Sequence, residues 1–138
     1  MTINQISVFL ENKSGRLAEV TRLLGDGGVN LRALTIADTA DFGILRLIAD
    51  DLNKALKILE DGGFTARVTE VIGVEVSDKP GGLAKVLDIF SKRGVNIEYI
   101  YASLERNKEN AIIIFKVEDI DKGTKVLEEN KFKIVSTW

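Results

Sequence analysis

The chain lacks the two residues that most often carry metal-binding and acid–base chemistry. Its 138 residues include no cysteine and no histidine. Without cysteine there is no disulfide, thiol nucleophile or zinc–thiolate site, and a cytoplasmic location is the default expectation. Without histidine the commonest general base and the commonest metal ligand are missing. Few routes to catalysis remain.

A charge excess of one sign and long apolar runs are also missing. Nineteen basic residues face 21 acidic ones, for a formal net charge of −2. This balance argues against partners that need a basic surface, such as nucleic acid or an anionic membrane. No apolar run approaches the length of a membrane span, and the first residues do not resemble a secretory leader. With 45% hydrophobic and 29% charged residues, we expect a soluble globular protein.

The most informative feature that is present is an internal repeat. Asn12–Leu31 reads NKSGRLAEVTRLLGDGGVNL, and Asp78–Ile97 reads DKPGGLAKVLDIFSKRGVNI, with eight of twenty paired positions identical. Each copy is a short turn, a helix, a glycine stop and the start of a strand. Self-similarity of this kind indicates that one copy is one structural unit.

Hydrophobic periodicity predicts the order β-α-β-β-α-β, twice. Apolar residues alternate in the strands and recur at helical spacing in the helices, where Leu17, Val20 and Leu24 form the expected buried stripe of the first one. The predicted ranges of the first copy are strand 2–10, helix 16–25, strands 30–39 and 42–50 with a turn at 40–41, helix 52–61 and strand 64–69. In the second copy, a strand at 72–77 and a helix around 83–90 precede strands 96–105 and 111–117, a last helix and strand 132–137.

These patterns predict the fold class α+β, as two tandem ferredoxin-like domains, 1–70 and 71–138. Each would be a four-stranded antiparallel sheet with two helices on one face. Residues 64–77 contain no polar linker, with Gly73 as the one soft point, so we expect the copies to pack rigidly as a pseudo-dimer. Whether the closing strands are exchanged between the copies stays open.

Because many functions share this fold, function has to be argued from sites. The central strands, FGILRLIAD and AIIIFKVED, are too aliphatic for an RNA-recognition surface. The aspartates and glutamates show no repeated pairing, and we interpret them as solvated faces and helix caps. We therefore expect no enzyme, no cofactor and no metal.

The repeated turn is the first candidate site. Residues 12–15 and 78–81 lie where a strand enters a helix, so a polar side chain, unpaired N–H groups and a partial positive charge meet there. Such a place can hold a carboxylate. The structural alternative is that Asn12 and Asp78 cap the helices, that Pro80 is a first-turn proline and that the glycines serve geometry.

Two asparagines are the second candidate. Asn30 and Asn96 each follow Gly-Val at the start of a strand, where asparagine is a poor strand former. Their side-chain amides could bind the polar end of a ligand. Turn formation is the alternative.

The pattern [Asn/Asp]-Lys-[Ser/Pro]-Gly-x-Leu-Ala-x-Val, followed by Gly-Val-Asn, resembles the ACT domain, a small-molecule regulatory module. The resemblance covers nearly the whole chain as two copies, and the first has Ser14 where proline is usual. The stretch GVNLRALTIADTADFGILRLIADD is also similar to stand-alone tandem-ACT proteins and, more distantly, to the regulatory subunit of acetolactate synthase.

The resemblance implies that an amino acid binds at an interface between ACT units. Serine-responsive members have a histidine where Leu10 and Val76 stand here, which favours a more apolar side-chain pocket. Asp78 would repel a ligand carboxylate but attract its ammonium group, so the two sites, with Asn12 in one and Asp78 in the other, differ in affinity or only one works. Carried over by position, the ligand-binding residues are Asn12, Lys13, Ser14, Gly15, Arg16, Leu17, Asn30 and Leu31 in the first copy, and Asp78, Lys79, Pro80, Gly81, Gly82, Leu83, Asn96 and Ile97 in the second.

We therefore expect a non-catalytic, homodimeric regulatory protein that binds an amino acid and acts on a partner enzyme of amino-acid metabolism. The ligand would stabilise one packing of ACT units over another. The alternative is a structural or protein-interaction module that regulates a partner enzyme without binding a ligand. In that case the aliphatic hairpin of residues 96–105 and 111–117 would provide the edges for association.

Overall fold

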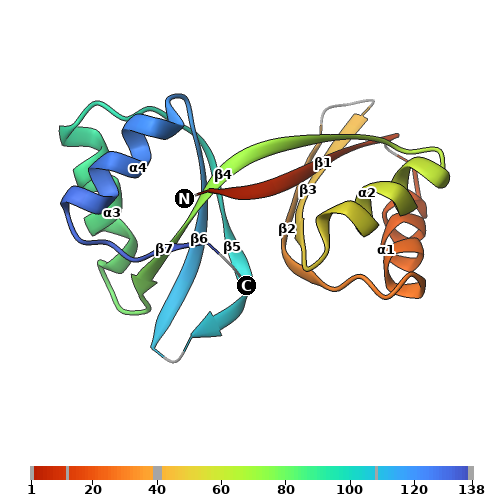
Figure 1. Cartoon of the computed structure of the whole chain (residues 1–138), viewed down its shortest axis with the longest axis horizontal. Helices are drawn as coiled ribbons and strands as arrows, with labels where there is room; N and C mark the ends of the chain where they lie inside the picture. Colours follow the sequence, from red (N-terminus) through yellow and green to blue (C-terminus); the bar gives the residue numbers. More distant parts are fainter. Residues whose placement is uncertain (1, 12, 39–41, 108, 137–138) are drawn as a thin grey trace. The chain divides into compact units, whose positions relative to one another are not determined.

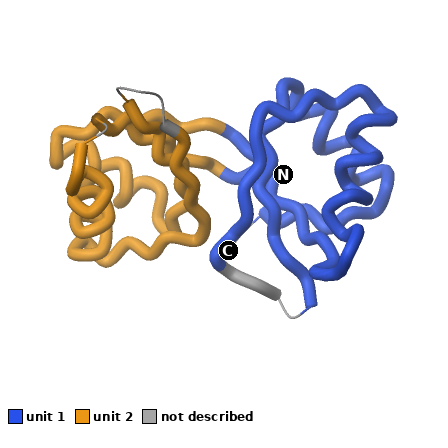
Figure 2. The backbone as a smooth tube through the Cα atoms, turned by 180° about the vertical axis from the view of Figure 1, so that it is seen from behind, with its two compact units in different colours: residues 1–3, 70–138 blue, residues 4–69 orange. Residues whose placement is uncertain are grey.

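The computed structural model describes residues 2–11, 13–38, 42–107 and 109–136. The chain divides into two compact units (Figure 2). We name Asn4–Thr69 the N-terminal unit, and Met1–Ile3 together with Glu70–Trp138 the C-terminal unit. The change of unit near residue 70 falls inside a strand, and the first residues of the chain group with the C-terminal unit.

The N-terminal unit is an antiparallel sheet with two helices on one face (Figure 1). Strand β3 lies between β1 and β2, which places Glu11 opposite Phe42 and Leu31 opposite Ala49. The predicted turn at 40–41 lies outside the described residues. The elements are β1 (Ile3–Glu11), α1 (Arg16–Asp26), β2 (Leu31–Asp38), β3 (Phe42–Ala49), α2 (Leu52–Asp61) and the beginning of β4 (Thr65–Ser77).

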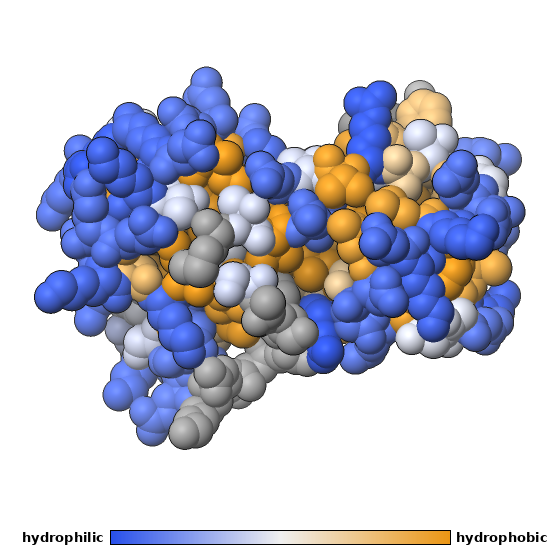
Figure 3. All heavy atoms as spheres, viewed as in Figure 1, coloured by the Kyte–Doolittle hydropathy of each residue, from blue (hydrophilic) through white to orange (hydrophobic). Residues whose placement is uncertain are grey.

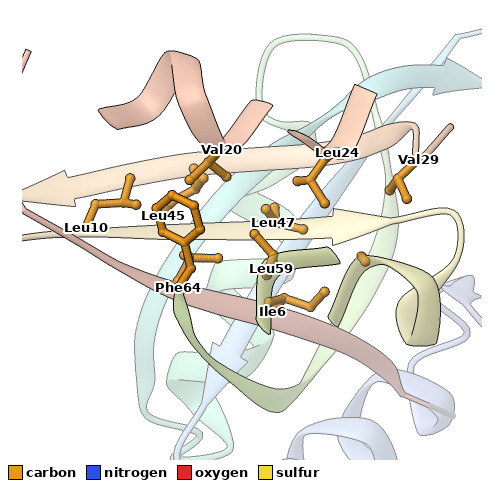
Figure 4. Close-up of a cluster of buried hydrophobic side chains, with 11 residues drawn as sticks. Ile6, Leu10, Val20, Leu24, Val29, Leu45, Leu47, Leu59 and Phe64 are labelled. Atoms are coloured by element: carbon orange, nitrogen blue, oxygen red, sulfur yellow. The ribbon is translucent and has the colours of Figure 1, made fainter. Parts of the chain in front are cut away.

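Between the helices and this sheet lies an apolar core (Figure 4). The expected stripe on α1 is confirmed for Val20 and Leu24, which are fully buried. It is wrong for Leu17, which is 39% exposed. Leu17 lies in the first turn of α1, where it lines a pocket instead of packing into the core. The other buried members are Ile6, Val8, Leu10, Val29, Leu45, Leu47, Ala55, Leu59 and Phe64.

The C-terminal unit repeats this arrangement with the strand order β5-β6-β4-β7. Its core includes an edge-to-face pair, Phe90 and Phe115, with ring centroids 5.4 Å apart. Strand β7 pairs with β4, the first strand of its own copy, so this closing strand is not exchanged. The elements after β4 are α3 (Gly82–Lys92), β5 (Ile97–Asn107), β6 (Asn110–Val117), α4 (Ile120–Glu129) and β7 (Ile134–Val135).

The predicted absence of a linker is confirmed, because residues 65–77 form one uninterrupted strand. The interpretation of Gly73 as a soft point is wrong. Gly73 is buried and pairs with Ile114 and Val135, and a Cβ atom built on it would lie 2.7 Å from Cδ1 of Ile3. Close packing explains this glycine. Glu75 also departs from the expected solvated faces, since it is 8% exposed and pairs with Lys133 Nζ at 3.0 Å.

Two aspartates start the second helix of each copy. Asp51 and Asp119 accept hydrogen bonds from the N–H groups of Lys54 and Lys122, both at 3.1 Å. Asp51 and Asp119 are therefore the N-caps of α2 and α4, and Asn130 is the C-cap of α4. No helix in the described part of the chain is long and apolar enough to cross a membrane.

Candidate functional site

The turn between the first strand and first helix has the same backbone in both copies. Gly15 and Gly81 occupy the N-cap position with φ of 89° and 85°, a left-handed conformation that disfavours any residue with a Cβ atom. Glycine has no capping side chain, and Asp78 stands three residues before the cap. The capping alternative is therefore wrong for Asp78, while Asn12 lies outside the described residues. Pro80 is exposed in the turn and does not begin the helix.

Backbone hydrogen bonds repeat from one turn to the other. The N–H of Arg16 donates to the Lys13 carbonyl at 3.3 Å, and the N–H of Gly82 donates to the Lys79 carbonyl at 3.0 Å. In each unit, the N-terminus of the first helix, with its partial positive charge, therefore lies at the turn. Ser14, Lys13 and Lys79 are exposed there.

The side chains around the two turns differ, and in the N-terminal unit they form a pocket of about 270 Å³. Gly43 pairs with Leu10 and has no side chain, which leaves space between Leu10 and Ile36. Leu17 closes this space from α1. The apolar floor is therefore Leu10, Leu17, Ile36 and Gly43, and the polar rim is Glu11, Lys13 and Arg16.

The rim of the pocket carries both negative and positive side chains. Lys13 Nζ lies 2.9 Å from Glu11 Oε2. The hydrogen bond from Lys13, the Lys13 charge and the Arg16 charge hold the pKa of Glu11 below its usual value of 4.5. Glu11 is therefore a carboxylate at neutral pH.

Arg16 is held against the wall of the pocket. Its Nη1 donates to Glu19 Oε2 at 2.8 Å, and its guanidinium lies 4.8 Å from the centroid of the buried Phe64 ring. The Nε atom is buried and has no hydrogen-bond partner among the described residues.

The C-terminal unit has other residues at the paired positions. Ser77 replaces Glu11, Gly82 replaces Arg16, and Ala102 replaces Ile36. A Cβ atom built on Gly82 would overlap the Ser77 carbonyl oxygen, so helix α3 begins directly against the end of β4. Arg16 has a Cβ atom, so α1 must start further from β1. Leu83 is half-buried and packs on the C-terminal core.

Asn30 and Asn96 lie at the other end of their units. Along β3, Gly43 marks the turn and Ala49 faces Leu31, six residues or roughly 20 Å away. Figure 4 shows Leu10 and Val29, the neighbours of Glu11 and Asn30, at opposite ends of the buried cluster. In the C-terminal unit Ser77 pairs with Asn110, whereas Ile97 pairs with Val117. Neither unit brings its turn and its asparagine into one site.

The asparagines instead tie two strands together. The backbone N–H of Asn30 donates to Asp50 Oδ1 at 3.0 Å, and the Asn96 amide donates to Glu118 Oε2 at 3.2 Å. In both copies the asparagine carbonyl accepts from the backbone N–H of the same acidic residue. Leu31 and Ile97, half-buried at the strand starts, belong to this end. These contacts favour the structural interpretation of Asn30 and Asn96.

A second pocket of the N-terminal unit, about 430 Å³, lies between α2 and the start of β4. No basic residue lines it, and Glu60 is its charged residue, so it offers a carboxylate no counter-charge. Within the described residues no group of three acidic side chains is placed to hold a metal ion. The turn pocket is therefore the better candidate.

Comparison with known proteins agrees with this architecture. The family model described as an ACT domain pair matches residues 1–137. The chain belongs to this family. The solved structure of a protein from Bacteroides thetaiotaomicron is 46% identical, covering 98% of this chain and 92% of that one, with a TM-score of 0.91.

The chain is also similar to a small subunit of one enzyme and to a regulatory subunit of another. The acetolactate synthase small subunit of Mycolicibacterium smegmatis is 38% identical over 73 residues, which span 49% of this chain and 43% of that protein. The chain therefore matches less than half of that relative's length. The regulatory subunit of aspartate kinase from Thermus thermophilus shares the fold at 18% identity, with a TM-score of 0.66 over 93% of this chain and 92% of that one.

The sequence missed part of the pocket of this ACT domain pair. Lys13, Arg16 and Leu17 were predicted from the turn, and Leu10 from its position, but Glu11, Ile36 and Gly43 were not. Ile36 and Gly43 come from the predicted hairpin. The strand pairing that places Gly43 beside Leu10 would have found them.

Proposed function

We propose that this ACT domain pair is a non-catalytic regulatory protein that binds a free amino acid at the turn between β1 and α1. One observation carries the proposal: a pocket with an apolar floor has a carboxylate and two cations on its rim. A free amino acid at neutral pH carries an ammonium group, a carboxylate and a side chain, and this pocket offers a counterpart to each. Its volume lies just below the usual range for small-molecule sites.

The way in which binding would regulate a partner follows from linkage. A ligand shifts an equilibrium only by its differential affinity for the two states. Because the turn and the asparagine lie at opposite ends of one unit, a ligand that touched both would need residues from two ACT units. We therefore propose that binding changes how ACT units associate, including in a homodimer, and that a partner enzyme of amino-acid metabolism responds. Residues 1–70 and 71–138 are the proposed ACT domains.

A thermal-shift screen against the twenty amino acids at millimolar concentration tests this function. A ligand at a hundred times its Kd adds roughly 2.7 kcal/mol of stability, which shifts the melting temperature by several degrees. We expect at least one amino acid to give this shift. If none does, the pocket is not an amino-acid site, and the interaction module without a ligand becomes the better account.

A matched pair of variants locates the site. Gly43→Val adds an isopropyl group whose Cβ atom would meet Ile36 Cδ1 at an ordinary 3.5 Å, so we expect it to fill the pocket without disrupting the strand. Ala111→Val makes a similar change at the paired position of the C-terminal unit. We expect the first variant to abolish the ligand shift and the second to retain it. The reverse result would move the site to the other turn.

A further inference from the structure

The two turns share the left-handed glycine and one lysine, but they differ in most of the side chains around the pocket. Of the three charged rim residues in the N-terminal unit, the C-terminal unit keeps only the lysine. Ser77 provides no carboxylate for an ammonium group. Gly82 provides no guanidinium for a carboxylate. A Cβ atom at this position would overlap the Ser77 carbonyl oxygen, so a larger residue would require helix α3 to lie further from β4.

We propose that each chain holds one effector site, at the N-terminal turn, and that its ligand is an α-amino acid with an aliphatic side chain. This inference rests on the proposed function and specifies its stoichiometry and ligand class. The ligand carboxylate pairs with Arg16 and Lys13, and its ammonium pairs with Glu11. Its side chain lies on Leu10, Leu17 and Ile36, which offer no hydrogen bond to a polar side chain.

Arg16 is the residue that separates the two turns. Its guanidinium lies 4.8 Å from the centroid of the Phe64 ring and pairs with Glu19, and these two contacts fix its position at the pocket. A carboxylate accepts two parallel hydrogen bonds from a guanidinium, which lysine cannot provide. Arg16 therefore selects for the free carboxylate of an amino acid.

Calorimetric titration with L-leucine, and with L-serine and L-lysine for comparison, tests the inference. We expect one leucine per chain and much weaker binding of serine and lysine. Arg16→Gln should weaken leucine binding about tenfold, the usual effect of losing a hydrogen bond to a charged group. Lys13→Gln should weaken it about threefold, since Lys13 is exposed.

Lys79→Gln is the matched control, because Lys79 is the same residue at the paired position of the other turn. We expect it to leave the Kd unchanged. Two leucines per chain, or an equal loss from Lys79→Gln and Lys13→Gln, would overturn the single site while leaving the proposed function intact. Tighter binding of serine or lysine than of leucine would overturn the ligand class. Absence of binding by all twenty amino acids would overturn the proposed function itself.

Discussion

The two copies are alike at one end of the fold and different at the other. At the asparagine end, each copy joins its strand starts with an asparagine and an acidic residue, Asn30 with Asp50 and Asn96 with Glu118. At the turn end, the backbones match but the pocket residues do not. The contacts between the asparagine and the acidic residue occur in both copies. The side chains that could recognise a ligand differ, which is where a duplicated unit can specialise.

Several apolar side chains are exposed near the turn of the N-terminal unit. Hydrophobic residues reach the surface among charged ones in the space-filling view (Figure 3). In the N-terminal unit, Leu17, Ile36 and Phe42 are 39%, 48% and 58% exposed. Leu17 and Ile36 line the pocket, so their exposure has a functional explanation in the proposed site.

The largest expected effect comes from opening the C-terminal turn. Gly82→Ala places a Cβ atom on the Ser77 carbonyl oxygen, which is backbone and cannot rotate away. We expect a loss of about 2–3 kcal/mol in the free energy of unfolding by urea, as in an overpacked core. Gly25→Ala is the control, because nothing lies within 4 Å of its Cβ position. It should stabilise the protein by about 0.5–1 kcal/mol. If Gly82→Ala is also stabilising, helix α3 can move away from β4, and the inferred difference between the two turns is wrong.

The next effect should be the same in both copies. Gly15→Ala and Gly81→Ala force an L-residue into a left-handed conformation, and nothing else lies within 4 Å of either Cβ position. Each substitution should therefore cost about 1–2 kcal/mol of unfolding free energy. Melting curves of the two variants check this. A difference larger than about 1 kcal/mol would show that the two backbones are not equivalent.

A smaller effect concerns the pH dependence of binding at the N-terminal turn. The pKa of Glu11 is lowered, so the carboxylate stays charged until the pH falls through its folded value, below 4.5. Affinity for an amino acid should be constant from pH 8 to about pH 5 and fall about threefold below pH 4. Titrations at pH 7.5, 5.5 and 3.8 measure this. Glu11→Gln should bind about threefold more weakly at pH 7.5 and lose the pH dependence, and a retained dependence would exclude Glu11 as the ammonium partner.

The smallest effects are expected at the asparagines. Asn96→Ala removes an exposed amide bond to Glu118 and should cost about 0.5 kcal/mol of unfolding free energy. Asn30→Ala should cost less, because its contact with Asp50 uses the backbone N–H. Urea unfolding of both variants tests this order. A loss above about 2 kcal/mol at either position would mean that these contacts matter far more than their exposure suggests.

Sequence patterns predicted the elements and the duplication well, and the site less completely. The repeat, the glycine stops and the periodicity identified the helices, and α2 begins and ends where expected. The buried stripe failed at Leu17, because periodicity does not reveal that this residue lines a pocket instead of packing into the core. From the resemblance, Asn30 was predicted to bind the same ligand as the turn. Strand pairing, which the sequence does not give, places it at the opposite end.

Gly82 illustrates the same limit from the other side. The C-terminal turn has the proline that the N-terminal turn lacks, and only Asp78 indicated from the sequence that the two turns differ as carboxylate sites. Only the contact between the Gly82 position and the Ser77 carbonyl distinguishes a closed turn from an open one. A glycine in a sequence indicates either a backbone conformation that other residues avoid or a close approach of neighbouring atoms. The structure shows which of the two applies.

Amide chemical shifts in a ¹⁵N-labelled sample test the central claim most directly, because Gly15 and Gly81 report on the two turns within one molecule. Saturation with L-leucine should shift the amide peaks of Gly15, Arg16 and Leu17 and leave those of Gly81, Gly82 and Leu83 in place. Equal shifts at both turns, or shifts confined to Gly81–Leu83, would contradict a single amino-acid site in the N-terminal unit.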